Sequence, residues 1–241
     1  MRVIALFCLI FFTLPARAEV TVFAAASLRG ALDEVNAAFD GDVTVSYASS
    51  AALARQIAQG APADVFLSAN PDWVAHLDSD PFVDLQAQGA FLGNQLVLIG
   101  SATAQEATLG TLVPNLDGRD LATALTTAVP AGIYARQALK SLGIWADVET
   151  HLVQTDNVRA ALALVSLGEV SYGLVYQTDA LAGDQIRVLD QVSPDTHRPI
   201  LYLAALLTSD AQAADYFAHV KSEAALKVFE AHGFQKPQEG F

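Results

Sequence analysis

Between residues 20 and 39, a largely apolar run is followed by apolar positions with helical spacing. A β-branched, apolar run begins at Val20 and ends in three alanines, Ala24 to Ala26. Ser27 comes next, and after it apolar residues recur with helical spacing at Leu28, Leu32, Val35 and Phe39. This pattern predicts a strand that runs through small residues into a helix, with Ser27 at the N-cap position.

Residues 43–57 repeat this arrangement. A second predicted strand, 43–47, leads through Ser49 and Ser50 into a second helical pattern. If the two strands are parallel neighbours, both serine turns lie at the carboxyl edge of one sheet, where open α/β sheets bind ligands. The first N–H groups of a helix have no partner within it and carry partial positive charge, so such turns can hold an oxyanion without a cationic side chain. The alternative is that Ser27 only caps its helix.

Strands and helices continue to alternate through the rest of the chain. Further strands are predicted over 64–67, 95–99, 148–153, 171–176, 186–189 and 200–207. Further helices are predicted from Pro71, over 133–141, from Asn157 to Gly168, and over 211–220 and 222–231. This alternation predicts an α/β fold with mostly parallel sheets and helices on both faces of each sheet.

A change of composition divides the chain into two lobes. Residues 101–120 are polar and irregular, whereas 200–207 is a strand rich in Leu and Ala. We place the two inter-domain crossings next to these segments. Residues 19–99 and 201–241 then form a discontinuous first lobe, and residues 100–200 form the second.

The predicted second lobe has three further positions at which a helix begins. Ala131 follows Pro130 at one helix start, Val158 follows Asn157 at another, and Tyr176 ends a strand before a third. Each position also has a purely structural interpretation: a helix start and no more, a buried core residue, and a ring packed in the core. Two facing lobes would bring these three positions opposite the two serine turns.

The first eighteen residues have the pattern of a secretory signal peptide. Arg2 is a basic start, residues 3–14 are apolar, and Ala16-Arg17-Ala18 is a small-x-small cleavage site. The apolar stretch is shorter than the roughly 20 residues that span a bilayer. The single cysteine, Cys8, lies within it, so a chain cleaved before Glu19 has no thiol and no disulfide. We therefore expect an exported, periplasmic protein without a lipidated N-terminal cysteine.

The chain is acidic, with a formal net charge of −13. Removal of residues 1–18 lowers the number of basic residues from thirteen to eleven against twenty-six acids, which makes the net charge −15. Such a protein is a poor partner for nucleic acid or for an anionic membrane surface. An anionic ligand would have to be held by local dipoles against this overall field.

Sequence signatures of enzymes are absent from the chain. There is no Gly-x-Ser-x-Gly nucleophile elbow and no glycine-rich phosphate loop, and the five histidines are scattered without metal-ligand spacing. These observations favour a binding module without catalytic residues. The alternative from another class is a secreted serine hydrolase that uses Ser27 or Ser50.

Five stretches of the chain resemble the periplasmic molybdate-binding proteins that serve ABC transporters. They are residues 21–28 (Thr-Val-Phe-Ala-Ala-Ala-Ser-Leu), 47–63, 129–135, 157–165 and 173–176 (Gly-Leu-Val-Tyr). The likeness runs in order from Glu19 to Phe234. The chain differs from most members in lacking a Gly-Asp-Pro segment before Val129-Pro130-Ala131-Gly132, where it has residues 122–128 instead.

The resemblance implies a two-lobed periplasmic-binding-protein fold of type II that closes about a hinge. It also implies a set of ligand-binding groups: the hydroxyl and N–H groups of Ser27 and Ser50, the N–H groups of Ala131 and Val158, and the Tyr176 hydroxyl. Molybdenum would be bound as the oxyanion, through hydrogen bonds and without direct protein–metal ligands. The implied protein is a monomer that binds molybdate or tungstate, needs no cofactor and delivers its ligand to a membrane permease.

Neutral donors match the chemistry of such a ligand. A fully deprotonated tetrahedral dianion has only acceptors, whereas phosphate near neutral pH keeps a proton that needs an acceptor in the site. Sulfate fits the same donors, so cavity size must separate it from molybdate. A binding protein of the same fold for sulfate or another small oxyanion is therefore the nearest alternative function.

Overall fold

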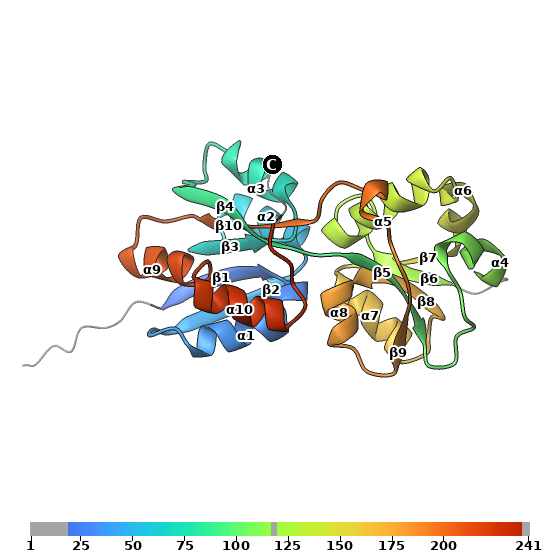
Figure 1. Cartoon of the computed structure of the whole chain (residues 1–241). Helices are drawn as coiled ribbons and strands as arrows, with labels where there is room; N and C mark the ends of the chain where they lie inside the picture. The colour runs from blue at the N-terminus through green and yellow to red at the C-terminus, as the bar shows by residue number, and fades with distance from the viewer. Residues whose placement is uncertain (1–18, 117–119, 238–241) are drawn as a thin grey trace, which may run out of the picture.

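The computed structural model describes residues 19–116 and 120–237. The predicted signal peptide, residues 1–18, lies outside these residues. The described residues form two lobes, each built on a five-stranded sheet (Figure 1). The first sheet has the order β2-β1-β3-β10-β4, made of Val43–Ala48, Val20–Ala25, Val65–Ser68, Leu201–Leu206 and Ala87–Gly93. The second has the order β7-β6-β8-β5-β9, made of Leu152–Thr155, Leu121–Ala124, Tyr172–Tyr176, Leu96–Ser101 and Ile186–Gln191.

The predicted α/β class is confirmed, but both sheets are mixed. In the first sheet β2, β1 and β3 are parallel, and β10 pairs antiparallel with β3 and with β4. In the second, β7, β6 and β8 are parallel, and β5 pairs antiparallel with β8 and with β9. The antiparallel strands β5 and β10 are the ones that enter each lobe from the other. A strand that arrives from the facing lobe starts at the inner edge of its sheet, whereas the parallel strands end there.

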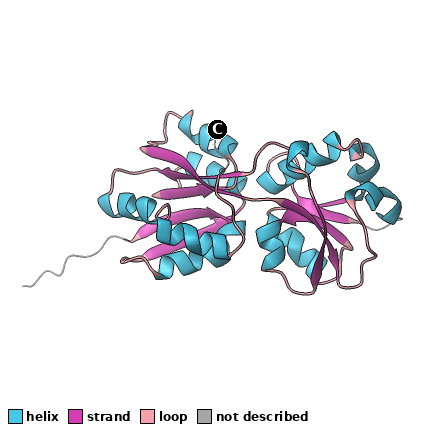
Figure 2. Cartoon of the chain, viewed as in Figure 1, coloured by secondary structure: helices cyan, strands magenta, loops and turns pink. Residues whose placement is uncertain are grey.

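Helices cover both faces of each sheet (Figure 2). The first lobe carries α1 Arg29–Ala37, α2 Ser50–Ala58, α3 Pro71–Asp78, α9 Ala211–His219 and α10 Glu223–Ala231. The second carries α4 Leu112–Leu116, α5 Pro130–Ser141, α6 Trp145–Val148, α7 Val158–Ser166 and α8 Gln177–Leu181. Short 3₁₀ turns occupy Ala26–Leu28 (η1), Leu109–Thr111 (η2), Glu149–His151 (η3) and Pro194–Thr196 (η4).

Alternation along the strands sends side chains to opposite faces of the first sheet. The neighbours Val22 and Phe23 are both buried, but Val22 belongs to the cluster under α1, α9 and α10, and Phe23 to the one under α2 and α3. The same two faces receive Leu32 from α1 and Leu53 from α2. No helix among the described residues has the length and apolar character needed to cross a bilayer.

One predicted strand begins later than expected, and two strands were missed. The strand predicted over 148–153 begins only at Leu152, after α6 and a 3₁₀ turn. Strand β4 was not predicted, because this edge strand contains the exposed Gln88 and two glycines. Strand β6 was missed because two of its four residues are alanines, which are depleted in strands.

The first crossing between the lobes comes earlier than the predicted boundary. Strand β5 begins at Leu96 and pairs only within the second sheet, so the chain passes between the lobes at Asn94 and Gln95. The chain returns to the first lobe through the segment 192–200, which leads into β10.

Candidate functional site

The five residues predicted to bind a ligand line one pocket where the two lobes meet. Its lining residues are Ala25, Ala26, Ser27, Ser49, Ser50, Ala69, Val129, Pro130, Ala131, Asn157, Val158 and Tyr176. The first six come from the first lobe and the last six from the second. Sequence positions as far apart as Ser27 and Tyr176 are thus brought to one place by the facing of the two sheets.

The pocket is small and carries no formal charge. The space for the centre of a water-sized sphere is about 10 Å³, which is close to what a single water molecule needs. Among the described residues that line it there is no Asp, Glu, Lys, Arg or His. A ligand of this pocket must therefore be small, and its charge must be balanced by dipoles and hydrogen bonds.

Ser27 presents its hydroxyl from a 3₁₀ turn. The chain leaves β1 through η1, so Ala25 is the N-cap of that turn and Leu28 the N-cap of α1, both without a side-chain cap hydrogen bond. The predicted N-cap role of Ser27 was therefore wrong. The side chain is buried, and its Oγ lies 2.8 Å from Oη of Tyr202 in β10.

Ser50 is held by a different partner. Ser49 is the N-cap of α2, and its Oγ accepts a hydrogen bond of 3.3 Å from the N–H of Ala52. This leaves Ser50 as the first helical residue, fully buried, and its Oγ accepts a hydrogen bond of 2.9 Å from the N–H of Ala69. Ala69 follows β3, the third parallel strand of the sheet.

The second lobe brings helix starts to the pocket. Pro130 is the first residue of α5, and Ala131 follows it. A Cβ on Gly132 would lie 2.1 Å from the carbonyl oxygen of Ala124, so only glycine lets the start of α5 pack this closely on the end of β6. This contact fixes the start of α5, with Ala131, at the edge of the pocket.

Helix α7 begins at Val158, and its N-cap is Asn157. The Asn157 Oδ1 accepts a hydrogen bond of 3.0 Å from the N–H of Ala160. The N–H of Val158 lies in the first turn, where no acceptor is available within the helix. The Val158 side chain is buried in the core, as the structural interpretation expected. The burial of the side chain and the position of the N–H at the pocket are compatible.

Tyr176 contributes a phenol without a protein partner. It ends β8, it is fully buried, and its Oη has no hydrogen-bond partner among the described residues. Burial raises the pKa of Tyr176 well above its usual value of 10, and the nearby Tyr202, Tyr134 and Asp179 raise it further. The phenol is therefore protonated, and it has one hydrogen to donate.

A buried ion pair lies one turn after Tyr176. Asp179 in α8 is fully buried, and its Oδ1 is 2.6 Å from Nε of Arg159, the residue that follows Val158. Burial raises the pKa of Asp179 to about 6, although the charge of Arg159 opposes the shift. The pair joins the starts of α7 and α8.

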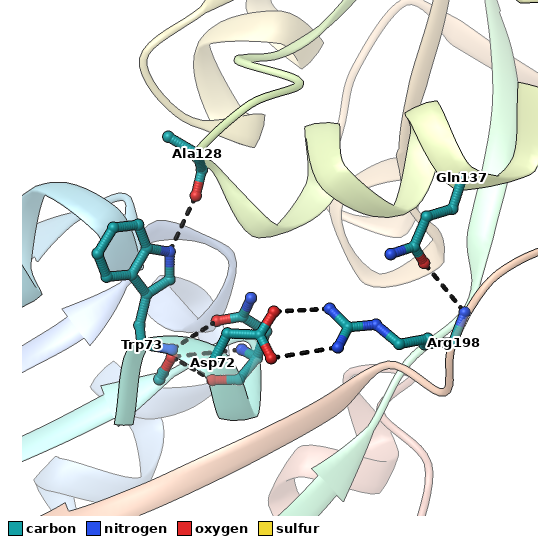
Figure 3. Close-up of polar contacts among 7 residues, drawn as sticks. Asp72, Trp73, Ala128, Gln137 and Arg198 are labelled. Atoms are coloured by element: carbon teal, nitrogen blue, oxygen red, sulfur yellow. Dashed lines mark hydrogen bonds and ion pairs between the residues drawn. The ribbon is translucent and has the colours of Figure 1, made fainter. Parts of the chain in front are cut away.

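A second set of contacts joins the lobes outside the pocket (Figure 3). The Trp73 Nε1–H in α3 donates a hydrogen bond of 2.9 Å to the carbonyl of Ala128, just before α5. Asp72 forms an ion pair with Arg198, whose Nη2 is 2.6 Å from the Asp72 Oδ2. The Arg198 N–H donates a hydrogen bond of 3.1 Å to Oε1 of Gln137 in α5. These contacts hold the start of α5 against the first lobe.

Sequence reasoning missed seven of the residues that line the pocket: Ala25, Ala26, Ser49, Ala69, Val129, Pro130 and Asn157. Most flank a predicted residue at the same helix start, so the pattern that marked the residue also contained its neighbour. Ala69 could have been found as the end of a third parallel strand before a capped helix. No group of three or more His, Cys, Asp or Glu in the described part of the chain is arranged to hold a metal ion.

The chain matches a family of solute-binding proteins and several named molybdate-binding proteins. The family described as "Bacterial extracellular solute-binding protein" matches residues 20–235. The molybdate-binding protein ModA of Haemophilus influenzae is 36% identical over 234 residues, which cover 92% of each chain. ModA of Escherichia coli is 35% identical and covers 90% of this chain and 88% of its own. The solved periplasmic molybdate-binding protein of Azotobacter vinelandii superposes with a TM-score of 0.80 at 22% identity, over 91% of this chain and all of that one.

Proposed function

Because the chain belongs to the family of bacterial extracellular solute-binding proteins, we propose that it captures molybdate between its two lobes and delivers it to an ABC transporter permease. The proposal takes its ligand from the relatives named for molybdate and its site from the pocket between the lobes. The proposed ligand-binding groups are the hydroxyls of Ser27, Ser50 and Tyr176, and the N–H groups at Ser27, Ser50, Ala131 and Val158.

The observation that carries the proposal is the chemistry of the pocket lining. A buried phenol without a partner, two buried serines and several helix starts surround a space for a few atoms, and no charged side chain among the described residues lines it. These groups supply hydrogen-bond donors to a ligand that consists only of acceptors. A small, fully deprotonated tetrahedral dianion has that character.

The strength of such a site is sufficient without a cation. Hydrogen bonds to charged groups contribute about 1.5–3 kcal/mol each, so five to seven give roughly 8–15 kcal/mol before the cost of closing the lobes. Micromolar to nanomolar affinity needs about 8–12 kcal/mol. Tungstate has the same charge and shape as molybdate, and we expect it to bind as well.

Hydrolysis by either serine has little support. Neither Ser27 nor Ser50 has a histidine or carboxylate among the described residues of the pocket lining that could act as a general base. We therefore propose a binding protein without catalytic residues. We also propose that it is exported by a cleaved signal peptide, acts in the periplasm as a monomer, and needs no cofactor.

Calorimetry with molybdate, tungstate, sulfate and phosphate tests the proposal. We expect tight, one-to-one binding of molybdate and tungstate, weaker binding of sulfate and the weakest binding of phosphate. Preferred binding of sulfate would assign the pocket to the alternative oxyanion. Absence of binding by all four, or reaction with a serine-directed phosphonate probe, would contradict the proposed function.

A further inference from the structure

We infer that Asn94 and Tyr202 set the direction of the Ser27 hydroxyl and so make the pocket selective for an unprotonated anion. This inference rests on the proposed function, because it concerns how the same pocket tells one oxyanion from another. Ser27, Asn94, Thr178 and Tyr202 form a buried network, with exposed fractions of 2%, 8%, 3% and 0%. One branch of this network leads from Asn94 through Tyr202 to Ser27 at the pocket.

The direction of the network begins at a main-chain donor. The N–H of Gln95 donates a hydrogen bond of 2.9 Å to Oδ1 of Asn94. A backbone N–H can only donate, so the side of the Asn94 amide that faces it must be the oxygen. The Asn94 Nδ2, with its two hydrogens, therefore faces the other way.

Asn94 then determines the role of Tyr202. Its Nδ2 lies 2.9 Å from Oγ1 of Thr178 and 3.2 Å from Oη of Tyr202, and it donates to both. Burial raises the pKa of Tyr202 far above 10, so the phenol keeps its single hydrogen. Tyr202 Oη accepts from Asn94, and we assign its hydrogen to Oγ of Ser27, 2.8 Å away, which is its other hydrogen-bond partner among the described residues.

Ser27 is thereby made a donor toward the pocket. Its Oγ accepts from Tyr202, and the hydrogen of the hydroxyl is left for a ligand. Ser50 reaches the same state directly, because the N–H of Ala69 donates to its Oγ. The two serine hydroxyls are thus oriented by different groups. A backbone amide orients that of Ser50, whereas two side chains, which can be substituted, orient that of Ser27.

This arrangement discriminates by protonation state. Hydrogen phosphate and sulfate are tetrahedral dianions of nearly the same size, but hydrogen phosphate carries one proton that must be donated. When the Ser27 and Ser50 oxygens already accept hydrogen bonds from the protein, neither serine is free to accept that proton, which costs affinity. If the Ser27 oxygen becomes free to accept, the penalty falls for hydrogen phosphate and not for sulfate.

Two variants break the network in different ways. Tyr202→Phe removes the phenol hydroxyl, while the Asn94 amide keeps its hydrogen bond to Thr178. Asn94→Asp keeps the acceptor for the Gln95 N–H but replaces the donor with a second oxygen. In this second variant Tyr202 donates to the new carboxylate, and Ser27 donates to Tyr202 instead of to the ligand.

A third variant is the matched control. Tyr216→Phe removes a buried phenol that donates to Asn36 on α1, outside the pocket lining. It therefore costs the protein a buried hydroxyl, as Tyr202→Phe does, without touching the network that ends at Ser27.

The measurement is the ratio of sulfate affinity to hydrogen phosphate affinity, obtained by competition against molybdate at pH 8. We expect the ratio to fall tenfold or more in Tyr202→Phe, to fall further in Asn94→Asp, and to stay at the wild-type value in Tyr216→Phe. The added charge in Asn94→Asp acts equally on two dianions and cancels in the ratio. Thermal unfolding of the free proteins checks that each variant is folded.

The outcomes separate this inference from the proposed function. If both variants weaken all anions equally, or leave hydrogen phosphate binding undetectable, Asn94 and Tyr202 act only in packing and the inference is wrong. If the wild-type protein binds molybdate but the variants keep its ratio of sulfate affinity to hydrogen phosphate affinity, only the inference is overturned. A wild-type protein that binds none of the three anions would overturn both.

Discussion

The two lobes reach the same pocket with the same local architecture but with different chemistry. In the first lobe, strand ends lead to Ser27 and Ser50, whose buried hydroxyls are hydrogen-bonded to the Tyr202 hydroxyl and to the N–H of Ala69. In the second lobe, Ala131 and Val158 have no polar side chain and bring only main-chain N–H groups. Tyr176 adds the one side-chain hydroxyl from this lobe among the proposed ligand groups.

This difference determines which hydrogen-bond donors of the site can be removed by a substitution. Side-chain donors can be deleted by a single change to alanine. Main-chain donors survive almost any substitution and are lost only if the helix start moves or the N–H itself is removed. Substitution to alanine can therefore remove two of the three proposed hydroxyls from the first lobe, and only the Tyr176 hydroxyl from the second.

The strongest test of this comparison removes both hydroxyls from the first lobe. We expect Ser27→Ala with Ser50→Ala to weaken molybdate binding by about 10²- to 10⁴-fold, because each hydroxyl contributes a hydrogen bond to a charged ligand. Calorimetry measures the loss. Ser222→Ala is the matched control, since Ser222 caps α10 away from the pocket. It should lower stability by about 1 kcal/mol and leave affinity unchanged. Unchanged affinity in the double variant would remove the serine turns from the site.

The second lobe also carries a buried charge beside the pocket. Among the described residues Asp179 is the only charged side chain that is buried, and its pKa is raised from 3.8 to about 6. The folded state therefore binds more protons than the unfolded state between these values. Asp179 contributes stability below about pH 4, and this contribution is lost as the pH rises to about 6.

Asp179→Asn should remove this dependence. Relative to the variant, we expect the wild type to lose about 3 kcal/mol of unfolding free energy between about pH 4 and pH 7. Denaturant unfolding of both proteins across this range measures the difference. Parallel profiles would show that Asp179 does not titrate differently in the folded protein.

A pair of variants at Val158 tests the main-chain donor of the second lobe. Val158 is the first residue of α7, where proline is tolerated, and Asn157 has the extended backbone that precedes proline. Val158→Pro deletes one N–H, and we expect about 10- to 100-fold weaker molybdate binding. Val158→Ala keeps the N–H and should lower stability by about 0.5–3 kcal/mol with unchanged affinity. The reverse result would mean that the side chain, and not the amide, serves the site.

The smallest effect is expected where the lobes touch outside the pocket. Trp73→Phe keeps an aromatic ring but removes the donor to the Ala128 carbonyl. We expect roughly twofold to tenfold weaker molybdate binding through faster release, because one neutral hydrogen bond across the lobes is lost. Stopped-flow release measures the rate. Trp145→Phe, which changes a tryptophan stacked on Arg136 within the second lobe, is the control. An unchanged release rate in Trp73→Phe would show that the contact does not hold the lobes together.

The sequence alone determined the fold class, most of the elements and the five positions proposed to bind the ligand. It could do so because helix starts, small residues at strand ends and apolar periods are local, and each is legible within about ten residues. The start of α7 after Asn157, for example, follows from its own segment.

Only the tertiary structure decided what depends on distant segments. The partner of Ser27 is Tyr202, 175 positions away, so its hydroxyl could not be assigned from the turn around it. The antiparallel direction of β5 and β10 follows from the passage of the chain between lobes, which no local pattern records. The donor character of the pocket likewise arises where groups from both lobes are packed together. The donor character therefore depends on contacts between distant segments, whereas each helix and strand that contributes a donor is specified by its local sequence.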